Sequence, residues 1–300
     1  MPRILGKVDY HVFSHLIHTH YGIELSEDER EWFSLDGKEL RGSILRGAKR
    51  GEAIVHAVSH KGCKVVAEGF YCGAKESEIL AVRELLNASG LDKQKVAMDA
   101  LHLNPETLKQ VNLKEGIYLV GLKENQQELC QEMTFEAESQ KSIHSRTKRE
   151  KGHGRLERRS YECFDISGSW FDKRWKNSGM QTLVRVEKER EVVLNGNKSL
   201  EMSYYLSNMS VSNSKHAEEL FDATRNHWQV EVSNNGRDCV LAEDSLRCIN
   251  TETNRTTAVC RTLTIKLLKK SEIKNKCAQM DKFADDFQEL LTWLAKIKFL

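Results

Sequence analysis

An alternation of strand and helix patterns between residues 31 and 123 constrains the fold more than any other feature of the sequence. Three strand-like stretches come first, and the second and third of them meet at a short turn over Lys61 and Gly62. Two amphipathic helical patterns then alternate with two more strands. The expected elements within 31–43 are an apolar strand, the carboxylate of Asp36 and a glycine-containing turn. They are followed by strands at 52–60 and 63–72, a helix at 75–90, a strand from 95, a helix at 104–113 and a strand at 116–123.

This order predicts an α/β fold with a mixed β-sheet flanked by helices. The first three strands can form an antiparallel meander, whereas strands separated by a helix need a crossover and can pair in parallel. In such a sheet, functional side chains gather at the carboxyl ends of the strands. Asp36 and Asp99 each fall near the end of an expected strand. Because a carboxylate is costly to bury alone, both positions suggest a charge with a function.

The chain is expected to divide into four consecutive segments. Residues 1–30 predict a short helical lead, and residues 31–124 predict the first part of the sheet-based core. Residues 125–205 combine a polar, charge-dense stretch with short strand-like pieces, which predicts a β-rich insertion. Residues 206–300 would complete the core with a helix over 215–232 and add the C-terminal helices. The apolar positions at helical spacing in the lead are Val8, Val12, Phe13, Leu16 and Ile17.

Composition places the chain among globular proteins. It has 300 residues, of which 39% are apolar and 30% charged, and its net charge is only +2. None of its eight cysteines forms a C-x-x-C pair, so a zinc site is not expected and reduced thiols are predicted. The start lacks the apolar core of a signal peptide and no stretch approaches a membrane span, which predicts a cytoplasmic protein.

Two aspartates at neighbouring strand ends could hold a divalent cation. Carboxylate oxygens suit Mg²⁺ or Mn²⁺, and a third acid would complete a site for two metal ions in phosphoryl transfer. Glu231, on the helix expected over 215–232, is the candidate third acid. Ordinary structural roles stay open for all three residues. Asp36 and Asp99 could form turns or caps, and Glu231 could be an exposed helix position.

Positive charge is distributed unevenly along the sequence. The segment 140–160 is the densest, and basic residues also recur in 38–50 and 261–276. A nucleic-acid surface and a solvated, charged loop are both compatible with this pattern. The cations in these segments that we single out as DNA contacts are Lys38, Arg41, Arg146, Lys148, Arg149, Arg155 and Arg158.

Five motifs, in order and with compatible spacing, resemble the insertion-sequence DDE transposases, in the branch that includes the H-repeat-associated proteins. They are DGKELRGS, AMDALHLN, YLVGLKENQ, HGRLERR, and RNHWQVEV followed by AEDSLR. The resemblance covers most of the chain, from about residue 5 to about residue 270. It implies an RNase H-like mixed sheet flanked by helices, with a β-rich insertion before the helix that carries the last catalytic acid.

The resemblance also implies a function and the residues that perform it. Asp36, Asp99 and Glu231 would be the catalytic acids and would bind two Mg²⁺ ions, for which Mn²⁺ would substitute. The expected activity is cleavage and strand transfer of insertion-sequence ends, with double-stranded DNA as the partner and a homodimer or larger assembly on DNA. The protein would be cytoplasmic in a bacterium and associated with the nucleoid when bound. Further DNA contacts are expected from Arg225, His227 and Trp228, which match the block before the glutamate.

Two departures from the pattern of these relatives leave other functions open. Val232 follows Glu231 where relatives carry an asparagine, and a second His-Trp pair is absent. The helical segment before the core is also shorter than is usual among relatives. The alternatives are an inactive or repurposed DNA-binding remnant and a two-metal nuclease without strand transfer. Glu243 or Asp244 would be the third acid if Glu231 points away from the site.

Overall fold

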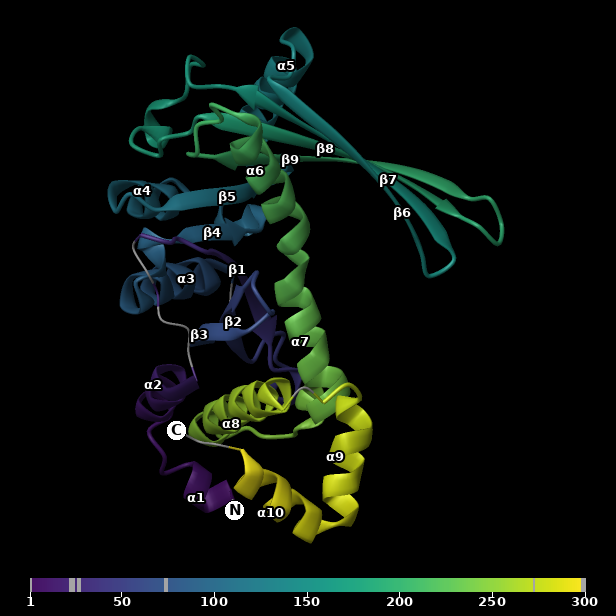
Figure 1. Cartoon of the computed structure of the whole chain (residues 1–300). Coiled ribbons are helices and arrows are strands. Elements are labelled where there is room, and N and C mark those ends of the chain that lie inside the picture. Colours follow the sequence, from purple (N-terminus) through teal and green to yellow (C-terminus); the bar gives the residue numbers. More distant parts are fainter. Residues whose placement is uncertain (1, 22–24, 26–27, 73–74, 272, 298–300) are drawn as a thin grey trace. The chain divides into compact units, whose positions relative to one another are not determined.

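The computed structural model describes residues 2–21, 25, 28–72, 75–271 and 273–297, which form two compact units (Figure 1). The first unit comprises Met1–Leu25, Asp36–Leu85 and Gln229–Leu300. The second unit comprises Ser26–Leu35 and Leu86–Trp228. Strand β1 (Trp32–Glu39) begins in the second unit and ends in the first.

The first unit contains the end of β1 and the antiparallel strands β2 (Glu52–Ser59) and β3 (Val65–Cys72), in the order β3-β2-β1. Side chains alternate between the two faces of β2. Ile54 packs with Ala258 of α8 (Thr251–Lys270), and Val58 packs with Val230 of α7 (Trp228–Leu241). On the opposite face, a Cβ at Gly69 would lie 3.7 Å from Leu85 of α3 (Lys75–Ser89). Helices therefore cover both faces of these strands.

The other helices of the first unit extend this core. Helix α2 (Tyr10–Tyr21) lies beside α8 and β3, where Tyr10 and Ile17 pack with Val259 and Phe70 (Figure 1). Helix α1 (Pro2–Leu5) contacts α8, and α9 (Lys276–Asp285) contacts α10 (Phe287–Lys296). The short helices η1 (Arg41–Ser43) and η6 (Glu243–Ser245) meet where a Cβ at Gly42 would collide with the backbone of Leu246.

The second unit is a mixed sheet in the order β1-β4-β5-β9-β8-β7-β6. Parallel pairing joins β1 to β4 (Lys95–Met98) and β4 to β5 (Ile117–Leu122). Antiparallel pairing then adds four longer strands, β9 (Lys198–Ser207), β8 (Thr182–Val192), β7 (Arg155–Asp165) and β6 (His144–Gly152). The short helices of this unit are η2 (Leu91–Lys93), η3 (Ala100–His102), η4 (Glu124–Gln126) and η5 (Lys173–Trp175).

Two helices pack on opposite faces of the long strands. Tyr161 and Val184 form a core cluster with Phe221 of α6 (Ser214–Asn226). Arg185, the next residue on β8, points to the other face and donates to the carbonyl of Ala137 in α5 (Gln127–Ser139). Helix α4 (Pro105–Leu113) lies against β5. The expected α/β fold, with a mixed sheet flanked by helices, is therefore confirmed.

Sequence patterns missed one helix of the second unit. The polar residues from 125 predicted no helix, yet α5 forms there and buries Leu129, Met133 and Ala137, which recur every four residues. The charge-dense stretch 140–160, for which a solvated loop was an open alternative, forms most of the β6–β7 hairpin. The division of the chain into four consecutive segments stays a prediction.

Two helical predictions were wrong in detail. The single helix expected over 215–232 is two helices, because α6 ends at Asn226 and α7 begins at Trp228. In α2, Val12 and Leu16 are exposed although both were expected on the apolar face. None of the described helices is long and apolar enough to cross a bilayer.

Candidate active site

Asp36 lies inside β1 and not at a strand end as the sequence predicted, because the strand continues through Gly37 to Glu39. Its side chain is partly buried. Its Oδ2 accepts a hydrogen bond from Nδ2 of Asn234, 3.4 Å away on α7. The side chains of Tyr71 and Glu78 lie against the next residue, because a Cβ at Gly37 would lie 2.6 Å from the hydroxyl of Tyr71 and 2.5 Å from the carboxyl carbon of Glu78. That hydroxyl donates to Glu78 over 2.7 Å, and burial together with this carboxylate raises the pKa of Tyr71. Asp36 thus shares its surroundings with neutral amide and phenol groups.

Glu231 belongs to the same unit as Asp36 and lies in the first turn of α7. Its side chain is exposed, while the preceding residue, Val230, is fully buried against Val58 and Val65. A carboxylate in the first turn also interacts favourably with the helix dipole. Asn234 follows Glu231 by three residues, so the two side chains lie on neighbouring turns of one helix face.

A buried polar network lies next to Asn234 in the first unit. The Oδ1 of Asn234 is 2.9 Å from Nδ1 of His56, which is fully buried on β2. Burial, assisted by the charge of Arg237, lowers the pKa of His56 to about 4, so the ring is neutral at neutral pH. Its Nε2 faces Oε2 of Glu68 at 3.9 Å.

Glu68 of β3 is buried but remains ionised. Its carboxylate accepts hydrogen bonds from Ser14 at 2.8 Å and Thr262 at 2.6 Å, and His18 lies 3.6 Å away. Burial alone would raise its pKa, but His18, His56 and Arg237 outweigh burial and lower the pKa of Glu68 to about 2. These contacts join β2, β3, α2 and α8 around one buried charge.

Lys38, two residues after Asp36, is held by three carboxylates. Its Nζ lies 2.6 Å from Asp238, 2.8 Å from Asp244 and 3.2 Å from Glu243, and its side chain is 10% exposed. Although burial opposes protonation, these carboxylates raise the pKa of Lys38 above its ordinary value. Arg41, also singled out for DNA, is exposed and lies 3.5 Å from Asp244.

The contacts of Glu243 and Asp244 bear on their alternative role as third acid. Glu243 also forms a buried ion pair with Arg237, which outweighs the effect of burial and lowers the pKa of Glu243 to about 2. Both carboxylates therefore neutralise protein cations, and Glu231 stays the candidate.

Asp99 belongs to the second unit, directly after β4. Its Oδ1 accepts a hydrogen bond from the backbone N–H of Leu101 over 2.9 Å, so it caps η3. The same oxygen lies 3.8 Å from Nε2 of His102, and the Asp99 side chain is 44% exposed. The capping role left open by the sequence is thus present, and it uses one of the two carboxylate oxygens.

The residues before Glu231 differ in their exposure. His227 is largely buried at the junction of α6 and α7 and forms a hydrogen bond with the backbone of Ala97. Burial lowers the pKa of His227, although the charge of Asp99 opposes that effect. Arg225 and Trp228 are exposed, Trp228 by 56%.

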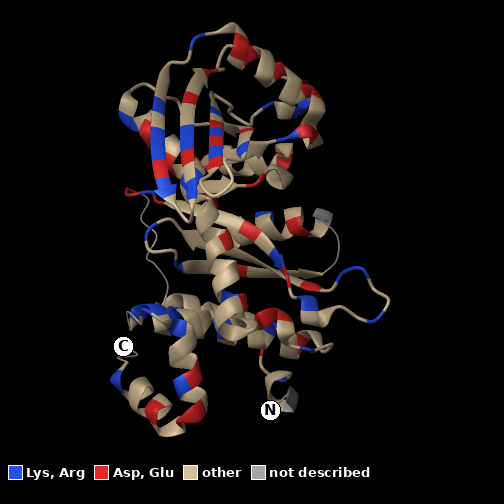
Figure 2. Cartoon of the chain, turned by 90° about the vertical axis from the view of Figure 1, so that its right-hand side faces the viewer, with Lys and Arg blue, Asp and Glu red and all other residues tan. Residues whose placement is uncertain are grey.

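The cations of the β6–β7 hairpin fall into two groups. Arg146 pairs with Glu218 and Asp222 of α6, Lys148 lies 3.7 Å from Asp222, and Arg158 lies 3.2 Å from Glu189 on β8. Figure 2 shows this mixture of Lys or Arg with Asp or Glu along the long strands. Toward the tip of the hairpin, three exposed cations have no ion-pair partner among the described residues. They are Arg149, Lys151 and Arg155.

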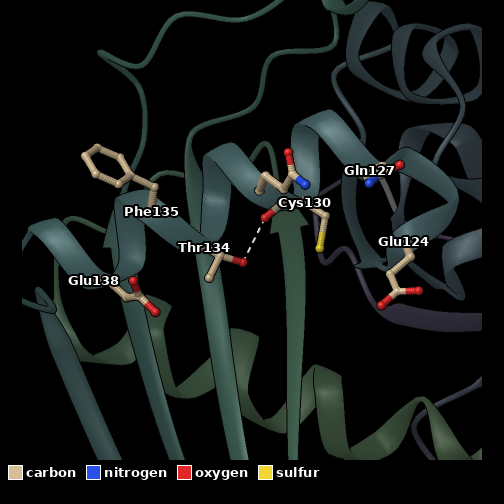
Figure 3. A pocket seen from close by; sticks show the side chains of 7 residues that line it. Glu124, Gln127, Cys130, Thr134, Phe135 and Glu138 are labelled. Carbon is tan, nitrogen blue, oxygen red and sulfur yellow. Dashed lines mark hydrogen bonds between the residues drawn. The ribbon is translucent and has the colours of Figure 1, made fainter.

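A hollow of about 600 Å³ runs along α5 in the second unit (Figure 3). Among the described residues that line it, the charged side chains are Glu124 and Glu138, and Phe135 is largely exposed beside them. Two carboxylates would repel phosphate. None of the predicted site residues lines this hollow.

The predicted metal centre stays a prediction. Within the described part of the chain, no group of three or more His, Cys, Asp or Glu side chains is arranged to hold a metal ion. Asp36 and Glu231 belong to the first unit, and Asp99 belongs to the second. The available donors are carboxylate oxygens, which are the ligands that Mg²⁺ and Mn²⁺ prefer.

Sequence reasoning missed several polar residues around Asp36, namely His56, Glu68, Asn234 and Arg237. One local signal existed, because His56 and Glu68 interrupt apolar stretches inside their strands, and all eight residues of β2 are buried. A polar residue inside such a strand needs a partner, since an unpaired buried polar group is costly. Asn234 and Arg237 carried no comparable signal in the polar stretch after Glu231.

Similarity to known proteins extends beyond the motifs. No family model matches the chain. "Putative protein YbfL" and "H repeat-associated putative transposase YhhI", both from Escherichia coli K12, are each 27% identical to it over 230 residues. That stretch is 74% of this chain and 60% of each relative. "Putative transposase YncI" of Escherichia coli O157:H7 is 28% identical over 215 residues, 68% of this chain and 52% of that protein.

The chain therefore spans about 60% of the length of the first two relatives. The aligned stretch is long enough to include most of the chain, and two of the three relatives are named as transposases. The resemblance seen in the sequence motifs is thereby confirmed, because the chain is similar to proteins named as putative transposases, one of them H repeat-associated.

Proposed function

We propose that the chain is a DNA transposase that cleaves and rejoins phosphodiester bonds at insertion-sequence ends. The observation that carries the proposal is its relationship to proteins named as transposases over 74% of its length. A second observation supports it from the structure. Asp36 and Glu231, two of the three acids, lie in one unit, and Asn234 of the Glu231 helix hydrogen-bonds to Asp36.

The topology is compatible with an RNase H-like core. Strands β1, β4 and β5 pair in parallel, and β2 pairs with β3 in antiparallel fashion. Strands β6 to β9 come between β5 and the helix that carries Glu231, which is where the resemblance places a β-rich insertion. These features support the proposed fold and the assignment of α7 as the helix of the last acid.

Asp36, Asp99 and Glu231 would hold two Mg²⁺ ions, and Mn²⁺ would substitute. When bound, such ions activate an attacking water or 3′-hydroxyl and stabilise the leaving oxygen. The protein itself would position the carboxylates and the DNA. The contacts of Asp99 are compatible with this role, because its cap occupies one oxygen and its side chain is 44% exposed. Lys38 would stabilise the strand that carries Asp36 rather than contact phosphate, because three carboxylates surround it.

Double-stranded DNA is the proposed partner, with a homodimer or larger assembly on it, in a bacterial cytoplasm. The proposed phosphate contacts are the exposed cations Arg41, Arg149, Arg155 and Arg225 together with Lys151. Trp228 is exposed enough to stack on a base or sugar. Arg146, Lys148 and Arg158 would contribute less, since carboxylates already neutralise them.

The proposal is tested by incubating the protein with DNA that carries the native flanks of its gene and Mg²⁺. We expect strand cleavage at the ends of the element and joining of the released 3′-hydroxyl to a second DNA. Asp36→Asn, Asp99→Asn and Glu231→Gln should each abolish both products while the variants still bind DNA. Cleavage without joining would indicate the nuclease, and binding without cleavage would indicate the remnant. If each of the three single variants still cleaves DNA, the proposed site is wrong.

A further inference from the structure

Asn234 makes two directed contacts that no motif predicted. It is 7% exposed and lies on α7, one turn after Glu231. Its Nδ2 is 3.4 Å from Oδ2 of Asp36, and its Oδ1 is 2.9 Å from Nδ1 of His56. One amide therefore links the helix of one proposed acid to the strand of another.

The chemistry of the two neighbours fixes the orientation of this amide. A carboxylate only accepts hydrogen bonds, so the NH₂ group of Asn234 must face Asp36 and its oxygen must face His56. With the amide in this orientation, a neutral His56 donates from Nδ1, and its Nε2, 3.9 Å from Glu68, makes no hydrogen bond with a described residue. Rotating the amide by half a turn would place its oxygen against the carboxylate of Asp36, which is repulsive. His56 is itself fully buried and packed beside Glu68, so the amide has a rigid support on the side away from Asp36.

We propose that Asn234 is a positioning residue for Asp36. Held by His56, its amide donates to Oδ2 of Asp36 and fixes the rotation of that carboxylate for a divalent cation. An ionised carboxylate has about four acceptor positions, and the hydrogen bond from Asn234 takes up one of them. Outer contacts of this kind orient metal ligands, and their loss weakens metal binding by roughly 10- to 100-fold. The inference rests on the proposed function, since it takes Asp36 as a metal ligand.

The test measures Mn²⁺ binding to the whole chain by titration calorimetry and electron paramagnetic resonance. Asn234→Leu removes the donor to Asp36 but also leaves the N–H of His56 without a partner, so its melting temperature should fall. The double variant Asn234→Leu with His56→Leu replaces both polar partners by apolar groups and should recover much of that loss. The matched control is Asn235→Leu, because Asn235 is the adjacent asparagine and its side chain is exposed.

If Asn234 positions Asp36, Mn²⁺ binding should weaken about tenfold or more in Asn234→Leu and stay weak in the double variant, although stability recovers. The control should bind Mn²⁺ as the parent does. Recovery of Mn²⁺ affinity together with stability would show that Asn234 only supports the fold, and parental affinity in Asn234→Leu would also overturn the inference.

The Asp36→Asn variant distinguishes failure of the positioning role of Asn234 from failure of the proposed function. If the parent binds Mn²⁺ and Asp36→Asn does not, the metal role of Asp36 stands whatever the Asn234 variants do. If Asp36→Asn binds Mn²⁺ like the parent, or the parent binds none, the proposed metal site fails and the inference fails with it.

Discussion

Arg237 and Glu243 form a bidentate ion pair in the interior of the first unit. The Nη2 of Arg237 lies 2.6 Å from Oε1 of Glu243, and its Nε lies 2.9 Å from Oε2. The two side chains are 1% and 0% exposed. Arg237 also donates to the hydroxyl of Thr262 and the carbonyl of Ala258 in α8. The pair thereby ties the end of α7 to η6 and α8.

The first prediction follows from the cost of breaking such a pair. Arg237→Met would remove the cation that pairs with Glu243 through two hydrogen bonds and leave that buried carboxylate beside Lys38. The free energy of unfolding should therefore fall by about 3–5 kcal/mol. Urea denaturation at neutral pH measures the change. Replacing both residues by methionine removes the uncompensated charge, and this double variant should lie closer to the parent. A single variant as stable as the parent would show that the pair does not hold α7 in place.

The second prediction concerns acid stability. The pKa of His56 is about 4 in the folded protein, compared with 6.5 for an ordinary histidine. As the pH falls, the imidazole is therefore protonated in the unfolded chain before it is protonated in the folded protein. The contribution of neutral His56 to the free energy of unfolding is therefore complete above pH 6.5. It is lost between pH 6.5 and pH 4, which lowers the free energy of unfolding by an amount on the order of 3 kcal/mol. Glu68 and Glu243, with pKa values of about 2 instead of 4.5, should add a second loss below pH 4.5. Urea denaturation across this pH range would show both stages.

His56→Gln provides the control for the first stage. Glutamine keeps an amide donor for Asn234 but does not titrate, so the decline between pH 6.5 and 4 should shrink while the decline below pH 4.5 remains. If the decline between pH 6.5 and 4 is unchanged, another group causes it.

Local sequence signals were sufficient for most of the elements between residues 31 and 123. Asn104 caps α4 at Pro105, and Gly90 takes the left-handed conformation (φ 72°) after α3, so both boundaries depend on neighbouring residues alone. Helix α5 was missed because its few buried apolar residues are separated by charged ones. The junction at His227 was missed because the apolar spacing continues on both sides of it.

The surroundings of the acids could not be predicted in the same way. Asp36 was identified from its motif, but its contact with Asn234 joins residues 198 positions apart. The contact of Asn234 with His56 spans 178 positions. Such contacts depend on strand order and on how α7 lies over β2, and no local pattern encodes either. Similarly, only the register of the hairpin and the position of α6 reveal that Arg146 is neutralised by Glu218 and Asp222.

The third prediction separates the two roles of Asp99. Asparagine caps a helix about as well as aspartate, so Asp99→Asn should keep the hydrogen bond from Leu101 and the parent's melting temperature. Asp99→Ala should lose about 1 kcal/mol with the cap. If Asp99 also binds metal, both variants should lose cleavage, and Mn²⁺ should raise the melting temperature of the parent more than theirs. A fully active Asp99→Asn variant would refute the proposed mechanism.

The last prediction distinguishes the two groups of cations on the β6–β7 hairpin. Three of these cations are exposed and have no ion-pair partner among the described residues, namely Arg149, Lys151 and Arg155. They could therefore neutralise DNA phosphates and release the counterions of the DNA. Changing all three to glutamine should reduce the slope of log affinity against log salt by about 3, because each phosphate contact contributes roughly 0.9.

The matched control changes three cations of the same hairpin that carboxylates already neutralise, namely Arg146, Lys148 and Arg158. The triple glutamine variant of this second group should lower the melting temperature, because it breaks contacts between strands and α6, while the salt slope changes little. Fluorescence anisotropy with labelled DNA at several salt concentrations measures the slopes. Equal slopes in the parent and the first variant would show that the tip of the hairpin is solvated and does not contact DNA.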